Sequence, residues 1–133
     1  MELTTPRDEP EARTGFECAN PILRVADLAR SVRYYVAVLG FTNAEWGGAD
    51  FTLVSRGGAG IYLAEGGQGN PGTWVWVGVE DAPALYREYA ASGATILEPP
   101  RNFPWAYELK VGDLDGHVLR FGSEPRGDLP LEP

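Results

Sequence analysis

The chain has 133 residues, of which 44% are hydrophobic and 23% are charged. This length and composition indicate one globular domain with a sizeable core. Eleven basic against nineteen acidic residues give a net charge of −8, which argues against nucleic acid or anionic lipid as a partner. No apolar run is long enough to span a bilayer.

Cys18 is the only cysteine, so no intrachain disulfide can form. The first fifteen residues lack the charged-then-apolar pattern of a secretion signal, and we expect a cytoplasmic protein. No base lies near Cys18 in the sequence, which favours a small buried side chain over a nucleophile. Both ends of the chain, residues 1–16 and 123–133, are rich in proline and acidic residues and are expected to be disordered tails.

The first structured unit follows as a strand, a helix and three short β-like runs. Residues 20–41 suit a strand followed by a helix, with Asp27 as N-cap and Gly40 just past the helix end. The β-like runs after it are NAEW, DFTLVS and GIYLAE, separated by glycine-rich stretches. The unit therefore reads β-α-β-β-β.

A shift of 54 residues reproduces this unit. Five residues recur in type after the shift, namely Val25, Asp27, Arg33, Tyr35 and Ala37 as Val79, Asp81, Arg87, Tyr89 and Ala91. Gly93 closes the second helix, and ATILE, AYELKV and HVLRF supply the later strands, with DLDG as a turn. The predicted fold is α+β, with one domain over residues 17–122 made of two βαβββ modules, 19–65 and 73–122. Residues 66–72 form the linker, which lacks the Lys-Ser/Thr of a phosphate loop.

The segment TWVWV at 73–77 opens the second module. Strand side chains alternate between faces, so Trp74 and Trp76 share one face while the valines at 75, 77 and 79 share the other. The valine face suits the core under the helix. Two tryptophans on the remaining face either plug the fold or bind a ligand, and the complete valine face favours binding.

These residues resemble a known family, the vicinal oxygen chelate superfamily of glyoxalase I, extradiol dioxygenases and bleomycin resistance proteins. DLARSVRYYVAVLGF at 27–41 and DLDGHVLRF at 113–121 carry the resemblance. The opening residues Asn20 to Leu23, TWVWV, and FPWAYEL at 103–109 are most similar to the bleomycin resistance branch. The resemblance implies strands that curl as a mixed sheet around a cavity, with the helices outside.

The resemblance also implies four metal-ligand positions, which here hold Asn20, Tyr62, Trp74 and Arg120. An indole and a guanidinium do not ligate a divalent ion, so no metal or other cofactor is expected. In place of a metal site we expect Trp74 and Trp76 to face the cavity. They would belong to an aromatic wall for a planar ligand, formed by Trp46, Tyr62, Trp74, Trp76, Phe103 and Trp105.

Three further polar side chains are candidates for the site. Arg24 and Arg120 fall on the cavity side of their strands, where they could bind a carboxylate; pairing inside the protein, for instance with Glu108, is the favoured interpretation. His117, the only histidine, follows a turn and is expected to be a solvated turn residue.

The sequence thus predicts a binding protein without chemistry, which sequesters a small planar or aromatic antibiotic, with bleomycin-type glycopeptides as one candidate. The resemblance implies a homodimer whose groove is built from both subunits, and Pro21 suits an edge that docks there. One alternative is a lyase or isomerase, like glyoxalase or a dioxygenase, acting on a small carboxylate or oxygenated substrate. Its metal would be held by Glu65 or Glu108, or Arg120 would act as the electrophile. Another alternative is a ligand from a neighbouring biosynthetic pathway.

Overall fold

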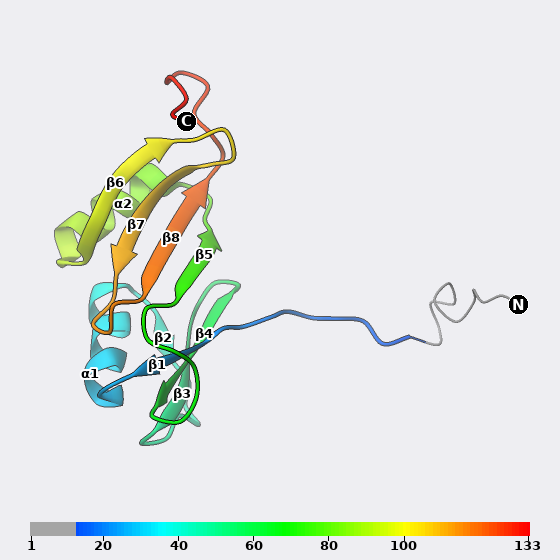
Figure 1. Ribbon diagram of the computed structural model, residues 1–133, viewed down its shortest axis with the longest axis vertical. Helices are drawn as coiled ribbons and strands as arrows, with labels where there is room; N and C mark the ends of the chain where they lie inside the picture. The colour runs from blue at the N-terminus through cyan, green and yellow to red at the C-terminus, as the bar shows by residue number, and fades with distance from the viewer. Residues whose placement is uncertain (1–12) are drawn as a thin grey trace, which may run out of the picture.

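A computed structural model of the protein describes residues 13–133. Two βαβββ modules are present, which confirms the predicted fold class, and their strands form two separate four-stranded sheets with no closed barrel. The first sheet has the order β1-β4-β3-β2 and the second the order β5-β8-β7-β6. Figure 1 shows the two sheets one above the other, and the N-terminal segment leaves the body as an extended trace.

The first module comprises β1 (Ile22–Val25), α1 (Leu28–Arg33), η3 (Tyr34–Val38), β2 (Thr42–Asn43), β3 (Phe51–Arg56) and β4 (Ala59–Glu65). The second comprises β5 (Trp74–Gly78), α2 (Ala82–Ser92), β6 (Thr95–Asn102), β7 (Tyr107–Gly112) and β8 (Val118–Ser123). In each module the first strand pairs in parallel with the last, and the remaining pairs are antiparallel.

Both helices begin where an aspartate caps them, as the repeat predicts. Asp27 accepts a hydrogen bond from the Arg30 amide, and Asp81 accepts one from the Ala84 amide. Gly93 ends α2 in the left-handed conformation, with φ of 88°, which glycine adopts without a Cβ clash. The repeat is therefore used twice with the same local chemistry.

The first helix continues into one π-helical turn, η3, which the sequence did not indicate. In this wider turn two consecutive tyrosines, Tyr34 and Tyr35, both point toward the interior, where they are buried. Tyr34 donates its hydroxyl hydrogen to the Gly112 carbonyl at 2.7 Å, and Tyr35 donates to Asp113 at 2.8 Å. Burial, together with the neighbouring Asp113 carboxylate, raises the pKa of Tyr35 well above its ordinary value.

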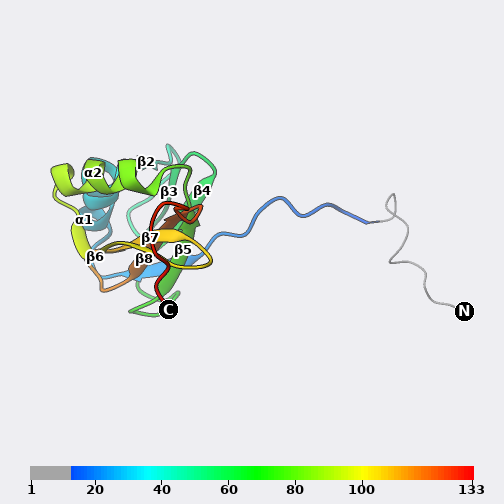
Figure 2. The same ribbon diagram turned by 90° about the horizontal axis from the view of Figure 1, so that it is seen from above.

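Tyr89, the repeat partner of Tyr35, makes the reciprocal connection from α2. Its hydroxyl donates to the Leu39 carbonyl at 2.7 Å, and burial raises its pKa to about 12. Each module thus inserts a buried tyrosine into the other. One continuous apolar core results, to which both helices and both sheets contribute, and Figure 2 shows the helices on one side of the strands.

The last eleven residues are not a free tail, contrary to expectation. The buried side-chain amide of Asn102, at the end of β6, donates to the carbonyls of Arg126 and Leu129. The backbone carbonyl of Asn102 accepts from the Glu132 amide. Residues 1–12 of the predicted N-terminal tail lie outside the described residues.

Candidate functional site

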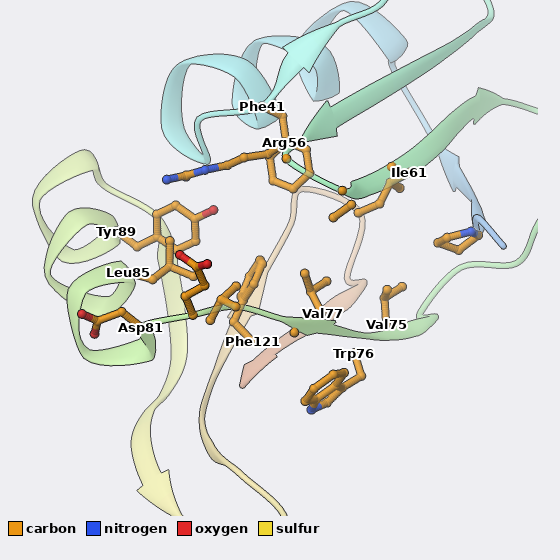
Figure 3. Close-up of a pocket in the computed structure, with 18 of the residues that line it drawn as sticks. Phe41, Arg56, Ile61, Val75, Trp76, Val77, Asp81, Leu85, Tyr89 and Phe121 are labelled. Carbon is orange, nitrogen blue, oxygen red and sulfur yellow. The ribbon is translucent and has the colours of Figure 1, made fainter. Parts of the chain in front are cut away.

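The tryptophans of β5 lie on the open face of the second sheet. The side chain of Trp74 is 59% exposed and that of Trp76 is 52% exposed, whereas the intervening valines pack against the core. In Figure 3 Val75 and Val77 point to one side of β5 and Trp76 points to the other. This confirms the alternation predicted from TWVWV.

Two glycines allow the indole of Trp76 to lie across the sheet. Gly78 of β5 pairs with Gly122 of β8. A Cβ added to Gly78 would lie 3.2 Å from Cζ3 of Trp76, and one added to Gly122 would lie 3.0 Å from its Cζ2. The benzo ring therefore rests on backbone that carries no side chains, which leaves its opposite face toward solvent.

A single buried carboxylate joins the polar edges of this surface. Glu108 is 1% exposed and lies on β7, in register with Gly122. Its Oε2 accepts a hydrogen bond from Nε1 of Trp76 at 3.0 Å and another from Nε1 of Trp105 at 3.3 Å. Its Oε1 accepts from Nε of Arg120 at 2.9 Å and forms the ion pair with the same guanidinium. The expected internal pairing of Arg120 is present.

Trp105 extends the surface from the β6–β7 loop. Its ring stacks on Phe103 with centroids 4.7 Å apart and an interplanar angle of 6°, and the guanidinium carbon of Arg101 lies 5.2 Å from the Phe103 centroid. Phe103 is only 7% exposed. It is covered by Trp105, which is itself 57% exposed, so Trp105 and not Phe103 offers ring surface at this place.

The other charges on this sheet are paired as well. Lys110 contacts Glu98 at 2.8 Å, and Arg101 bridges Glu98 and Glu132 at 3.0 and 2.7 Å. The hydrogen bond from Lys110 is the main reason that the pKa of Glu98 is lowered. The Lys110 ammonium also lies 6.0 Å from the ring centroid of Trp74.

The first sheet carries a second aromatic group, which includes a residue that the sequence reading missed. Tyr62 stacks on Phe51 with centroids 5.3 Å apart and an angle of 12°, and Trp46 lies 6.2 Å from Phe51. Phe51 could have been found from strand pairing. It lies two residues before Leu53 on β3 and so shares a face with Leu53, which pairs with Tyr62. Trp46 is 59% exposed.

The two arginines considered as carboxylate ligands come from different sheets and have different surroundings. Arg24 lies on β1 of the first sheet, and Arg120 lies on β8 of the second. Nε of Arg24 is buried and has no hydrogen-bond partner among the described residues, while Arg120 is held by Glu108.

His117 and Cys18 both differ from expectation. His117 is fully buried; its Nδ1 accepts from the Thr73 amide at 2.9 Å, so its Nε2 carries the hydrogen and donates to the Arg24 carbonyl at 2.6 Å. It thereby ties β1 to the start of β5. Cys18 is exposed, and its thiol lies 3.3 Å from the Asn20 side-chain oxygen.

A cavity of about 800 Å³ lies against β5 on the side of Val75 and Val77. The ring of Trp76 points to the opposite side of the strand (Figure 3), contrary to the expectation that the tryptophans face the cavity. Val75, Val77, Phe41 and Ile61 line it, as Figure 3 shows. The valines are half-buried because this space is open, whereas the sequence predicted a filled core. Its charged rim includes Glu88, whose pKa is lowered by the hydrogen bond from Arg56.

Comparison with protein families shows which family this chain belongs to. Residues 17–121 match the model described as "Glyoxalase/Bleomycin resistance protein/Dioxygenase superfamily". The chain belongs to this superfamily. No curated protein matches it.

Solved structures with this superfamily fold include antibiotic-binding proteins. The bleomycin-binding protein of bleomycin-producing Streptomyces verticillus, complexed with copper(II)-bleomycin, is 25% identical, with a TM-score of 0.72 over 86% of this chain and 100% of that one. TioX from Micromonospora sp. ML1 is 24% identical, with a TM-score of 0.71 over 82% and 99% of the two chains. TnmS3, an antibiotic-binding protein from Streptomyces sp. CB03234, is 20% identical, with a TM-score of 0.71 over 86% and 100%.

The residues at the superfamily's four metal-ligand positions do not fit a divalent ion. Asn20 donates its amide hydrogen to the Gly60 carbonyl, and Tyr62 is stacked on Phe51. The other two positions hold the Trp74 indole and the ion-paired Arg120 guanidinium, neither of which is a metal ligand. Within residues 13–133, no three or more of His, Cys, Asp and Glu gather to hold a metal.

The two carboxylates considered as substitute ligands are also occupied. Glu65 accepts a hydrogen bond from the Leu28 amide at 2.9 Å. Glu108 holds two indoles and a guanidinium. Stacking against exposed rings is therefore the chemistry that the second sheet offers. No helix within the described residues is long and apolar enough to cross a membrane.

Proposed function

We propose that this protein binds a planar aromatic small molecule of the antibiotic class and sequesters it without chemical change. One observation carries the proposal: Trp74, Trp76 and Trp105 each expose more than half of their surface on one sheet. An isolated protein gains little from large exposed rings gathered on one surface, and such patches mark binding sites. The antibiotic-binding proteins with the same fold support the same ligand class.

A homodimer would complete the groove. Strands β1, β2, β5 and β6 are sheet edges, and residues 13–133 leave the rings of the tryptophan face more than half exposed. Residues 13–19 extend away from the body, with Phe16 98% exposed. An extended arm, free edges and an uncovered aromatic face all favour contact with a second subunit.

The experiment combines binding with a test for chemistry. The purified protein is titrated with copper(II)-bleomycin, metal-free bleomycin and the three-ring planar compound phenazine, while tryptophan fluorescence and thermal unfolding are followed. We expect at least one compound to quench fluorescence and to raise the melting temperature in a saturable way. Mass spectrometry after incubation should recover that compound unchanged.

Two results would count against the proposal in different ways. A compound that is bound but recovered with a changed mass would favour the alternative of an enzyme. If all compounds leave both fluorescence and melting temperature unaffected, the aromatic face is not a binding site for planar ligands.

A further inference from the structure

We propose that Glu108 is a positioning residue that holds Trp76 and Trp105 in fixed orientations and offers only their ring faces to a ligand, so that the second sheet selects planar ligands by stacking and not by charge. This inference rests on the proposed function of that sheet. It adds a named residue and a restriction on the ligand.

The first step is the hydrogen-bond chemistry at Glu108. Four N–H groups converge on its two oxygens, from the indoles of Trp76 and Trp105 on one side and from the guanidinium of Arg120 on the other. An ionised carboxylate is the side chain that accepts at both oxygens. A glutamine of the same shape must turn its NH₂ group toward either the indoles or the guanidinium, so one side always meets donor against donor.

The second step is that, among the described residues, the polar edge of Trp76 has one side-chain hydrogen bond, the one to Glu108. Its benzo ring rests on Gly78 and Gly122, which are flat and carry no side chain to stop rotation. The hydrogen bond from Nε1 to Glu108 sets the direction of the ring on this surface. Glu108 is itself 1% exposed and ion-paired, so it is a rigid anchor.

The third step concerns Trp105, which lies in a loop. The loop closes through two backbone hydrogen bonds between Phe103 and Ala106, and the indole of Trp105 stacks on Phe103. The hydrogen bond to Glu108 attaches this loop to the same anchor that holds Trp76. The two rings are thus held relative to each other, although they come from a loop and from an edge strand.

The fourth step is charge. The basic residues of this surface, Arg101, Lys110 and Arg120, are each paired with a carboxylate from the set Glu98, Glu108 and Glu132. A ligand anion would have to displace one of these carboxylates, and a ligand cation one of the basic groups. The exposed ring surfaces of Trp76 and Trp105 can stack on a ligand without breaking an ion pair. A planar ligand without formal charge therefore matches the surface best, and its affinity should depend little on salt.

The positioning role can be measured without a ligand. The four tryptophans give four indole N–H signals in a ¹H–¹⁵N spectrum, assigned with single Trp→Phe variants. In Glu108→Gln we expect the Trp76 and Trp105 signals to move while the Trp46 signal stays in place. Glu98→Gln is the matched control, because Glu98 is also ion-paired on this sheet but has no hydrogen bond to an indole.

A double variant separates positioning from damage to the fold. In E108Q/R120M the guanidinium is gone, so the glutamine carbonyl is free to face the indoles, and both signals should return toward their original positions. The proposal is overturned if E108Q leaves the two signals unmoved, or if E98Q moves them equally. It is also overturned if a folded double variant shows no recovery.

The ligand restriction is tested with three probes of nearly equal shape: phenazine, which is neutral, 9-aminoacridine, which is cationic, and phenazine-1-carboxylate, which is anionic. We expect phenazine affinity to change less than twofold between 20 and 500 mM NaCl, to fall at least tenfold in E108Q, and to recover in E108Q/R120M. Stronger binding of either charged probe, with steep salt dependence, overturns the restriction. The role of Glu108 is refuted if the Trp76 and Trp105 signals do not shift in E108Q and recover in E108Q/R120M. If these shifts occur as expected but no probe binds, the proposed function is refuted and the role of Glu108 stands.

Discussion

Replacing Trp76 with alanine separates a binding surface from a structural plug. The side chain is 52% exposed, so the folded state hides about half of an indole, or about 100 Å². At about 25 cal/mol per Å² this corresponds to about 2.5 kcal/mol. The denatured chain also hides some of this area, which lowers the expected loss in the free energy of unfolding to about 2 kcal/mol.

The hydrogen-bond change adds little to this figure. Glu108 loses the Trp76 donor but keeps those of Trp105 and Arg120, so its carboxylate is not left without partners. No closed cavity forms either, because the ring lies on the outside of the sheet. A core aromatic behaves differently: Phe121 is 2% exposed, and Phe121→Ala should cost about 3–5 kcal/mol.

Ligand binding should depend on Trp76 more than on Phe121, the reverse of their order in stability. Trp76→Ala removes one stacking wall, and the affinity for phenazine should fall at least tenfold, which is about 1.4 kcal/mol. Urea unfolding measures the stability of each variant, and quenching of the remaining tryptophans measures binding. The interpretation of this strand is refuted if Trp76→Ala costs as much stability as Phe121→Ala, or if the variant binds phenazine as tightly as the parent.

Three further measurements follow from the same structure. Light scattering at micromolar concentration should give twice the 14.4 kDa chain mass, and a monomer mass would contradict the shared groove. Burial raises the pKa of Tyr89 from 10.0 to about 12. The contribution of this shift to the free energy of unfolding is therefore complete below pH 10 and is lost as the pH rises toward 12. Between pH 9 and pH 11.5 the free energy of unfolding should fall by about 1.8 kcal/mol, out of the roughly 2.7 kcal/mol that two pKa units represent. Tyr89→Phe should show less pH dependence. Elemental analysis should find well below one divalent metal per chain, because the side chains of Trp74 and Arg120 do not ligate one; a stoichiometric metal would revive the enzyme alternative.

The local features of the fold were predictable because each depends on a few neighbouring residues. Asp27 and Asp81 each cap a helix by accepting a hydrogen bond from the backbone amide three residues later. Gly93 adopts the left-handed conformation that suits glycine. The faces of Trp74 and Trp76 follow from the period of a strand alone. The repeat then predicted that the second module would copy the first.

Features that depend on contacts between modules were not predictable. His117 follows a turn, where solvent exposure is the usual outcome, but this turn lies against the first module and buries the ring between Thr73 and Arg24. The C-terminal segment has the composition of a disordered tail, yet one buried amide, that of Asn102, holds it. In both cases the deciding partner is distant in sequence.

Glu108 shows how far the site could be predicted from the sequence. Its charge suggested Arg120 as a partner. Its contact with the indole of Trp76 depends on the register that places Glu108 beside Gly122 and Gly122 beside Gly78. A shift of one residue along β7 would turn this carboxylate to the other face and remove the anchor. The face of each aromatic ring is therefore a property of its own strand, whereas its orientation, on which stacking selectivity depends, is set by the pairing of three strands.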